Sequence, residues 1–400
     1  MSLSHKKTTV ALHTLGCRSN QAQADQIKEK LAEIGFHLVP FKNKADIYIV
    51  NSCTVTHIAD RKSRIFLKKA HLQNPQALII LTGCYAQQIK TNFKFEIKTI
   101  ADIYAVPELL SLRLRSGNSE VPYSSPVRQN LLVQTGCENF CSFCIVPYVK
   151  GKFKSRTIGE IMADAKNKIK RGAKELVLTG TNLGAFGKDS QEKLEDLIDQ
   201  LAKLSLKRIR LSSFEPIYIT TQLINALKKN PKACPILHLP LQSGDNEILK
   251  KMERKYTVKE YLKILQQIKK TWPKVVFSTD IIVGFPGETD EQFQNTLNLI
   301  KKIGFVRVHI FSYSKRAQTK AAHFLNLSPQ TIRKRYLAAK KFCHGIEQDY
   351  INKKIGQEVE ILVEQKNPRG LWEGLTPDYL RYAFKSPKDL LGQLVKVKYQ

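Results

Sequence analysis

The chain is poor in acidic residues and has no long apolar run. Its 400 residues include 35 Asp and Glu against 65 Lys and Arg, which gives a formal net charge of +30. No stretch approaches the ~20 consecutive apolar residues that a membrane-spanning helix needs. Residues 1–7 lack the basic-then-apolar order of a signal peptide. We therefore expect a cytoplasmic protein that does not bind membranes.

The excess of basic residues indicates the kind of partner. Like charges repel each other in a compact domain, so a charge of +30 does not help the chain to fold. A polyanion offsets such a charge, and nucleic acid is the usual candidate besides an anionic membrane surface. No basic helix with aromatic anchors stands out as a membrane-surface element. The alternative is a lysine-rich composition with solvated faces.

Cysteines are the next informative feature. Disulfides are a poor explanation for cysteine in a cytosolic chain, so metal binding or catalysis is considered first. The chain has eight cysteines, and six of them fall into two groups of three: Cys17, Cys53 and Cys84, then Cys137, Cys141 and Cys144. The other two, Cys234 and Cys343, are interpreted as packing residues.

The first group follows strand-like runs near the start of the chain. Each of the runs 9–15, 45–50 and 77–81 ends just before a cysteine, and helical periodicity separates the runs. Alternation of strand and helix predicts a parallel sheet, in which sites form beyond the carboxyl ends of the strands. We therefore expect Cys17, Cys53 and Cys84 to converge on one edge of an N-terminal α/β domain, residues 1–115.

A second α/β domain is predicted for residues 131–345, after a polar linker at residues 116–130. Six βα units are too few for a closed eight-stranded barrel, so we expect a partial (βα)6 barrel with its site at the strand C-terminal ends. The strand-like runs are residues 131–134, 175–178, 208–212, 236–239, 275–282 and 306–311.

The last part of the chain changes character. A basic helical stretch at residues 327–349 leads to residues 346–400, where short runs alternate like antiparallel strands separated by Pro and Gly. The pattern predicts a small C-terminal antiparallel β-barrel, a form often used to hold RNA.

The second cysteine group directly follows the first strand of the predicted barrel. Cys137, Cys141 and Cys144 have the spacing C-x3-C-x2-C. Three thiolates can hold three irons of a 4Fe–4S cluster and leave the fourth iron open, as S-adenosylmethionine (SAM) requires for chelation. Zinc is the alternative, but structural zinc usually has four protein ligands, and no fourth Cys or His lies nearby in the sequence.

These features resemble the radical SAM superfamily and, within it, the methylthiotransferases. The C-x3-C-x2-C loop at the start of an α/β barrel carries the first resemblance. The three upstream cysteines and the terminal β-barrel carry the second. Residues 51–56, 59–64, 140–148 and 309–320 are similar to the branch that acts on N6-threonylcarbamoyladenosine in tRNA.

The resemblance implies two 4Fe–4S clusters, SAM, and a C-terminal TRAM-like domain that binds RNA. Cys137, Cys141 and Cys144 would hold the catalytic cluster that binds SAM, and the three upstream cysteines would hold an auxiliary cluster. The expected reaction adds a methylthio group to C2 of the adenosine at position 37, in the anticodon stem-loop. An electron donor such as flavodoxin or ferredoxin is implied, and the enzyme is expected to be a monomer.

Residues at the strand ends supply further candidates. Glycines permit close backbone approach to a ligand, and carboxylate or amide groups can bind the methionyl and ribose parts of SAM. The SAM candidates are Gly180, Thr181, Glu215, Gln242 and Asp280. The candidates for contact with RNA, by phosphate pairing or base stacking, are Arg18, Arg61, Arg64, Arg156, Lys315, Arg316 and Trp372. His238 and His309 are interpreted as hydrogen-bonded core residues rather than metal ligands.

Other substrates and another class of protein fit the same residues. N6-isopentenyladenosine in tRNA and an aspartate of a ribosomal protein are the alternative substrates within the family. A non-catalytic RNA-binding protein with a structural iron–sulfur cluster is the alternative class. Two groups of three cysteines argue against it, because a structural site is expected to close every metal position.

Overall fold

The computed structural model describes residues 8–88, 93–111 and 126–400. The chain divides into two compact units, one of Met1–Ser124 with Tyr148–Gly151 and the other of Ser125–Pro147 with Lys152–Gln400. Across the described ranges, no helix has both the length and the apolar character that crossing a membrane requires.

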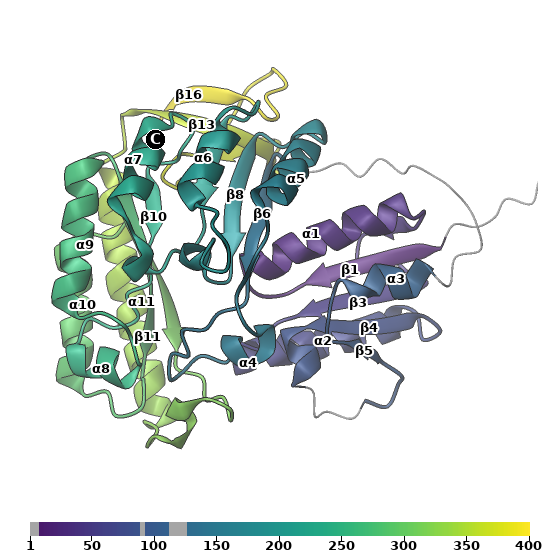
Figure 1. Cartoon of the computed structure of the whole chain (residues 1–400), viewed down its shortest axis with the longest axis horizontal. Helices are drawn as coiled ribbons and strands as arrows, with labels where there is room; N and C mark the ends of the chain where they lie inside the picture. Colours follow the sequence, from purple (N-terminus) through teal and green to yellow (C-terminus); the bar gives the residue numbers. More distant parts are fainter. Residues whose placement is uncertain (1–7, 89–92, 112–125) are drawn as a thin grey trace, which may run out of the picture. The chain divides into compact units, whose positions relative to one another are not determined.

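The first unit is a three-layer α/β domain with a five-stranded parallel sheet in the order β2-β1-β3-β4-β5. Helices α1 and α3 pack against one face of the sheet and α2 packs against the other (Figure 1). The elements are β1 (Thr9–Thr14), α1 (Arg18–Glu33), β2 (His37–Val39), β3 (Ile47–Ser52), α2 (His57–Gln73), β4 (Leu78–Gly83), η1 (Cys84–Gln87), β5 (Lys98–Ile100) and α3 (Ala105–Ser111).

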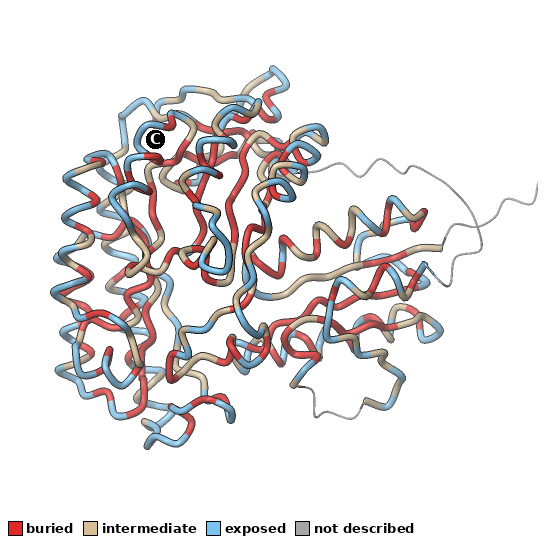
Figure 2. The backbone as a smooth tube through the Cα atoms, in the orientation of Figure 1, coloured by how far each residue is buried: buried red, intermediate tan, exposed pale blue. Residues whose placement is uncertain are grey.

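The sequence of this unit explains its layers. All residues of β3 are buried, because helices cover both faces of the sheet, and this strand accordingly reads as a nearly continuous apolar run (Figure 2). Helix α2 begins at a cap in which the side chain of Thr56 accepts from the backbone N–H of Ala59. The parallel sheet predicted for this part of the chain is confirmed.

The second unit contains six parallel strands in sequence order. Hydrogen-bonded ladders join β6-β8-β9 and β10-β11-β12, and the parallel bridge between Ser213 and His238 links the two sets. The strands are β6 (Arg128–Thr135), β8 (Glu175–Gly180), β9 (Arg208–Leu211), β10 (Ile236–His238), β11 (Val276–Val283) and β12 (Arg307–Ser312), with the short antiparallel β7 (Lys154–Ser155) beside β6. The order agrees with the predicted open barrel.

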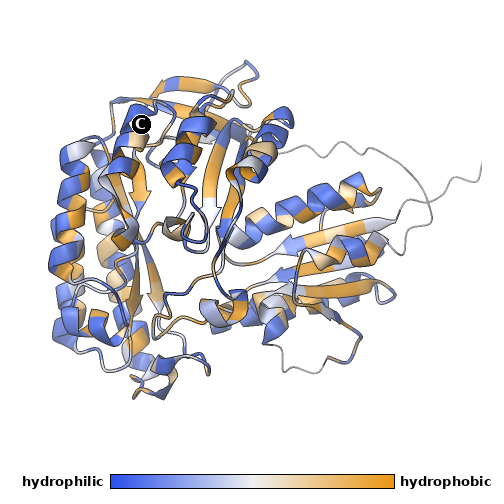
Figure 3. Cartoon of the chain, in the orientation of Figure 1, coloured by the Kyte–Doolittle hydropathy of each residue, from blue (hydrophilic) through white to orange (hydrophobic). Residues whose placement is uncertain are grey.

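Helices cover the outer face of these strands. Capping boxes start three of them, with Thr157, Thr257 and Thr289 as the N-caps. The helices are α5 (Ile158–Lys170), α6 (Leu194–Ala202), α7 (Thr221–Lys229), α8 (Asn246–Lys251), α9 (Val258–Thr271), α10 (Asp290–Ile303) and α11 (Pro329–Asn352), with the 3-10 turns η2 (Leu183–Ala185), η3 (Pro216–Tyr218) and η4 (Lys320–His323). Most of α4 (Val146–Lys150) belongs to the first unit. Buried apolar residues of the strands and of α5, α6, α7, α9 and α10 form one core. In Figure 3 the strands are mainly coloured as hydrophobic, and the helices carry both hydrophobic and hydrophilic residues.

The chain ends in a four-stranded antiparallel sheet with the order β15-β14-β13-β16. Its strands are β13 (Glu358–Lys366), β14 (Trp372–Leu375), β15 (Arg381–Phe384) and β16 (Leu394–Lys398). In the described part of the chain no ladder joins β15 to β16, so the predicted C-terminal barrel is an antiparallel sheet whose two edge strands are not paired.

Arginines of β9 attach this sheet to the barrel. Nη1 of Arg208 donates to the carbonyl of Leu375 at 2.6 Å, and Nη1 of Arg210 donates to the carbonyl of Pro377 at 2.6 Å. The carboxylate of Glu175 on β8 accepts from Nε of Arg210 at 2.8 Å, and both side chains are completely buried. Charged side chains near the N-terminal ends of β8 and β9 therefore bind the C-terminal sheet to the barrel.

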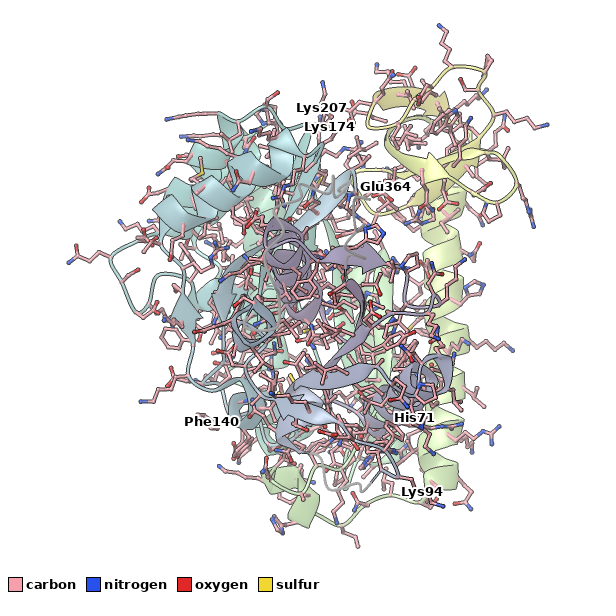
Figure 4. All side chains as sticks on the ribbon, turned by 90° about the vertical axis from the view of Figure 1, so that its right-hand side faces the viewer. His71, Lys94, Phe140, Lys174, Lys207 and Glu364 are labelled. Atoms are coloured by element: carbon pink, nitrogen blue, oxygen red, sulfur yellow. The ribbon has the colours of Figure 1, made fainter. Side chains whose placement is uncertain are left out.

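Other contacts place the C-terminal sheet at the same end of the barrel. Glu364 on β13 pairs with Arg128, the first residue of β6, at 3.1 Å. A Cβ added to Gly392 would lie 3.3 Å from Cγ of Lys174, the residue before β8. Figure 4 shows Glu364 near Lys174 and Lys207, which precede β8 and β9. The C-terminal ends of the barrel strands, where such folds place their sites, lie at the opposite end.

Short elements differ from the sequence-based expectations. Strands β2, β5 and β14 and helices α7 and α8 were not predicted, because elements of three to nine residues carry little periodicity. Strand β6 begins at Arg128, so the linker predicted for residues 116–130 ends earlier than expected. Residues 116–125 of that linker lie outside the described residues.

Candidate metal and cofactor sites

The first cysteine group lies at one edge of the parallel sheet. Cys53 and Cys84 directly follow strands β3 and β4, and Cys17 follows β1 after a short loop. These three strands are neighbours in the sheet. Gly16 has a φ of +96°, and a Cβ on it would lie 2.8 Å from Sγ of Cys53. Only glycine therefore lets the loop after β1 pass so close to the second cysteine.

Burial dominates the chemistry of the first group. Burial, with smaller contributions from the neighbouring Cys84 and Cys17 thiols, raises the pKa of Cys53 to about 12. Burial also raises the pKa of Cys84. Thiols held in the neutral form bind metals poorly, but a bound metal cation reverses this preference by stabilising the thiolate.

Lys150 brings a positive charge to the same edge of this unit. Its Nζ donates to Oδ1 of Asn20 at 2.8 Å and to Oε1 of Gln23 at 3.2 Å, both on α1. The charge lowers the pKa of Cys53 and Cys84 against the larger effect of burial. This lysine was not predicted as a site residue, because it lies far from these cysteines in the sequence.

The second cysteine group lies in the loop after β6, within the second unit. Cys141 is buried, and Cys137 and Cys144 are half-buried. Two contacts of Ser142 hold the loop: its N–H donates to the carbonyl of Met252 at 3.1 Å, and its hydroxyl donates to the carbonyl of Lys251 at 2.7 Å. The loop is thus anchored between two cysteines to the end of α8.

Phe140 gives this loop an unusual backbone turn. Its φ is +47°, a value that side chains rarely adopt, and 47% of the residue is exposed (Figure 4). Phe143 instead packs on a small apolar cluster that includes Ile248 and Phe285. The loop therefore exposes one aromatic ring and uses the other for packing.

Burial raises the pKa of all three thiols in this loop. The pKa of Cys144 rises to about 12, with additional contributions from the Cys141 and Cys137 thiols. Burial likewise raises the pKa of Cys137 and Cys141. Cys141 contributes to the raised pKa of both Cys137 and Cys144, so the thiols lie close enough to interact. The group suits a cation that takes up several thiolates at once.

The number of cysteines in each group favours a cluster over a single zinc ion. Thiolates around one zinc ion lie about 3.8 Å apart, given a Zn–S bond of about 2.3 Å. Among the described residues, the group of three ligand atoms mutually within 4.8 Å is that of His238, Asp280 and His309, and neither cysteine group meets this distance. Thiolates of a 4Fe–4S cluster bind separate irons, so three protein thiolates can hold a cluster, whereas structural zinc usually has four protein ligands.

Arg254 contacts a cysteine of the second group directly. Its Nη1 donates to Sγ of Cys141 at 3.2 Å, and its Nη2 forms an ion pair with Glu215. Its Nε donates to the hydroxyl of Tyr256 at 3.1 Å, and that hydroxyl donates to the carbonyl of Pro240 at 2.7 Å. The sequence alone did not indicate Arg254, since its contacts come from residues far away in the chain.

The predicted SAM residues end or follow β8, β9 and β10, except Asp280, which lies within β11. Gly180 ends β8, and a Cβ on it would lie 2.9 Å from Oε1 of Gln134. The hydroxyl of Thr181 is buried and makes no hydrogen bond within the chain, so it is able to bond to a ligand. Glu215 follows β9 and pairs with Arg254.

Gln242 and Asp280 are joined through the backbone. Gln242 has a φ of +65°, its N–H donates to the carbonyl of Asp280 at 2.9 Å, and its carbonyl accepts from the N–H of Ile282 at 2.9 Å. The Asp280 carboxylate lies 3.1 Å from Nε2 of His238. Oδ1 of Asp280 is therefore paired with a histidine of the neighbouring strand.

The residues predicted to contact RNA fall into both units. In the first unit, Arg18 begins α1, Arg61 is exposed on α2, and Arg64 donates to the hydroxyl of Tyr85 at 3.1 Å. These residues lie on helices that follow Cys17 and Cys53, at the sheet edge that carries the first cysteine group.

In the second unit, Lys315 is exposed and Arg316 is buried. Arg156 donates to the carbonyl of Leu132 at 2.7 Å and pairs with Asp164 at 2.9 Å, so its guanidinium is engaged inside the domain. These contacts explain Arg156 as a structural residue.

Trp372 lies in the core of the C-terminal sheet. It is 5% exposed, packs with Val363 and Leu390, and its Nε1 donates to the carbonyl of Lys388 at 2.9 Å. A base cannot stack on a ring that the sheet covers. The expectation that Trp372 contacts RNA therefore conflicts with its position, and the physical reason is burial of the indole in a small core.

Comparisons with known families agree with the two-unit architecture. Residues 131–300 match the family described as the radical SAM superfamily, and residues 9–104 match the uncharacterized protein family UPF0004. A solved structure of the methyltransferase TsrM from Kitasatospora setae, with tryptophan and a SAM analogue bound, has a TM-score of 0.54 and 12% identity over 79% of this chain and 75% of that chain. At this identity the likeness concerns the fold alone.

Curated relatives match almost the whole chain. The threonylcarbamoyladenosine tRNA methylthiotransferase MtaB of Bacillus subtilis is 34% identical over 98% of this chain and 93% of its own length. MtaB of Aquifex aeolicus is 35% identical over 97% and 99%. The tRNA-2-methylthio-N(6)-dimethylallyladenosine synthase of Dehalococcoides mccartyi is also 35% identical, over 97% and 94%. The chain belongs to the tRNA methylthiotransferase family of radical SAM enzymes.

Proposed function

We propose that this protein adds a methylthio group to C2 of N6-threonylcarbamoyladenosine at position 37 of tRNA. One observation carries the proposal: over nearly its full length the chain matches relatives named as threonylcarbamoyladenosine tRNA methylthiotransferases. Two separate groups of three cysteines, in which Cys17 is exposed and the others are buried or half-buried, support it. Each group lies at the carboxyl end of a parallel sheet, where α/β proteins place their ligands.

The second cysteine group is proposed to hold the cluster that binds SAM, with Cys137, Cys141 and Cys144 as its ligands. When bound, the clusters and SAM supply the one-electron chemistry, the sulfur and the methyl group that the reaction needs. Arg254 is proposed to position Cys141 through its N–H···S contact of 3.2 Å. Gly180, Thr181, Glu215 and Gln242 are proposed to line the SAM site on the same rim.

The first cysteine group is proposed to hold the auxiliary cluster through Cys17, Cys53 and Cys84. Lys150 supports the thiolate form there, because its positive charge lowers the pKa of Cys53 and Cys84. We assign the N-terminal domain to residues 1–115, the radical SAM domain to residues 131–345, and a TRAM-like RNA-binding domain to residues 346–400.

The tRNA is proposed to bind through its anticodon stem-loop, which the net charge of +30 supports. A target base leaves its stack at the least free-energy cost in a loop. Arg18, Arg61, Arg64 and Lys315 are proposed to contact phosphates. The enzyme is proposed to act as a cytoplasmic monomer that receives electrons from a donor such as flavodoxin or ferredoxin.

Nucleoside analysis tests the substrate. Mass spectrometry of tRNA from cells that lack only this gene is expected to show loss of 2-methylthio-N6-threonylcarbamoyladenosine and accumulation of its precursor without the methylthio group. Loss of the methylthio-isopentenyl nucleoside instead would assign the protein to the sister branch, in which the Dehalococcoides mccartyi synthase has the same 35% identity as MtaB of Aquifex aeolicus. An unchanged tRNA profile would contradict both substrates and direct the search to ribosomal protein.

A further inference from the structure

Three polar side chains meet on neighbouring strands of the barrel. His238 ends β10, Asp280 lies in β11, and His309 lies in β12, where it is the direct cross-strand partner of Asp280. One ligand atom from each lies within 4.8 Å of the others. We refer to these three residues as the histidine cluster.

The histidine cluster faces the interior of the barrel. Phe277, Ile281 and Val283 on β11 belong to the core beneath the outer helices, and Ile310 on β12 packs against that core. Side chains alternate between the two faces of a strand, so Asp280 and His309 point to the opposite face. That face is the inner surface of the partial barrel, where the strands of such folds present ligand-binding residues.

Hydrogen bonds fix one histidine of the cluster. Nε2 of His238 lies 3.1 Å from Oδ1 of Asp280, and its Nδ1 lies 3.0 Å from Oγ of Ser278. The ring of His309 lies 5.5 Å from the ring of His238 at 52°. His309 is the exposed member, whereas the side chains of His238 and Asp280 are 17% and 23% exposed. The cluster therefore presents an imidazole supported by an oriented His–Asp pair.

Such a surface suits a polar ligand and opposes an apolar one. The threonylcarbamoyl group carries a carboxylate, a hydroxyl and urea N–H groups, whereas the isopentenyl group carries no polar atom. Covering the histidine cluster with an apolar group would remove water from imidazole and carboxylate groups without replacing their hydrogen bonds. Sites built to hydrogen-bond a substrate group discriminate strongly against analogues that lack it.

We propose that His309, supported by His238 and Asp280, recognises the threonylcarbamoyl group and sets the choice between the two modified adenosines. His309 donates to the substrate carboxylate or hydroxyl, and Asp280, whose charge repels that carboxylate, accepts from a urea N–H or the hydroxyl. The inference rests on the proposed function, because it deepens the substrate assignment of the same site.

Binding measurements on the holoenzyme test this inference. The affinities for three anticodon stem-loop RNAs would be compared. The RNAs differ only at position 37, which carries threonylcarbamoyladenosine, isopentenyladenosine or unmodified adenosine. The wild type is expected to prefer the threonylcarbamoyl RNA to the unmodified RNA. Replacement His309→Phe is expected to reduce this preference about tenfold, as loss of one hydrogen bond to a charged group does, and to leave the affinity for the unmodified RNA within twofold.

Two variants control the measurement. His309→Gln keeps a side-chain donor and is expected to retain much of the preference. His344→Phe makes the same replacement at an exposed position of α11 and is expected to change nothing. Iron content and thermal midpoint of each variant show whether it folds and holds its clusters.

The outcomes separate this inference from the proposed function. If the wild type prefers the threonylcarbamoyl RNA and His309→Phe prefers it equally, the inference is wrong and the function stands. If the wild type shows no preference and forms no methylthio product on that RNA, the proposed function itself is wrong. A preference that disappears with a chelator and returns with zinc would show that the histidine cluster holds a metal ion, and this result would also overturn the inference.

Discussion

Replacement of the buried carboxylate of Glu175 should weaken the second unit markedly. Glu175 and Arg210 are completely buried, and the guanidinium also donates to the carbonyls of Pro377 and Thr376 beside the ring of Tyr379. Burial by itself would raise the pKa of Glu175, but Arg210, with Arg128 and Arg208 farther away, lowers it below the usual range. The carboxylate is therefore charged and balances a guanidinium that has no access to water.

The expected magnitude follows from that burial. Breaking a buried ion pair by neutralising one partner costs about 3–5 kcal/mol, because the remaining charge is left uncompensated. Glu175→Gln keeps an acceptor for Arg210, so we expect the free energy of unfolding to fall by about 3 kcal/mol, the lower end of this range. In a domain of this size, each kcal/mol lost from the free energy of unfolding lowers the thermal midpoint by about 2 °C, so we expect a fall of about 6 °C. The double replacement Glu175→Met with Arg210→Met is expected to recover part of the loss.

Differential scanning calorimetry under anaerobic conditions measures this change, with the transition of the second unit followed separately. Glu358→Gln is the matched control, because it neutralises a carboxylate in an exposed ion pair. The side chains of Glu358 and its partner Lys396 are 65% and 69% exposed. We expect no measurable shift for the control. A midpoint of Glu175→Gln equal to that of the control would refute the reasoning that the buried pair holds the barrel and the C-terminal sheet together.

Four further outcomes are expected. Cys53→Ala should remove about half of the iron and leave the spectrum of the other cluster intact, by iron assay and electron paramagnetic resonance; unchanged iron content would contradict the auxiliary site. Arg254→Met should lower the reduction potential of the SAM-binding cluster by about 60 mV in a redox titration, if a charged hydrogen bond of about 1.5 kcal/mol favours the more negative reduced state; an unshifted potential would contradict the contact. Trp372→Ala should destabilise the C-terminal sheet by about 3–5 kcal/mol. The smaller change Trp372→Phe should leave RNA affinity unaltered in a filter-binding assay. A large loss of affinity in Trp372→Phe would show that the indole stacks on RNA after all. Burial would raise the pKa of Asp378, but hydrogen bonds from Thr376 and other neighbours lower it. The ionised carboxylate therefore stabilises the fold above the unfolded pKa of about 3.9, and this stabilisation is lost as the pH falls through the lower folded value. Asp378→Asn should flatten the fall of the thermal midpoint over that acid range, and an equal fall in both proteins would count against this reasoning.

Much of the fold follows from local pattern. Long strands such as β3 and β11 and helices such as α5 and α9 repeat their apolar residues often enough to be predicted from sequence alone. The strand–helix alternation also predicted that Cys17, Cys53 and Cys84 share one sheet edge, because parallel strands end on the same side. Short strands such as β2 and β14 escaped prediction, since three or four residues do not establish a period.

The chain by itself determined the α/β class, the order of the barrel strands and the two cysteine groups, because periodicity and spacing are properties of neighbouring residues. Only the tertiary structure decided which distant residues meet these elements. Arg254 reaches Sγ of Cys141 across more than a hundred positions of sequence, Trp372 turned out to be a core residue, and His238 and His309 came together with Asp280 on the inner face of the barrel. Such contacts depend on how strands pair and which face each side chain takes, and a linear pattern does not contain that information.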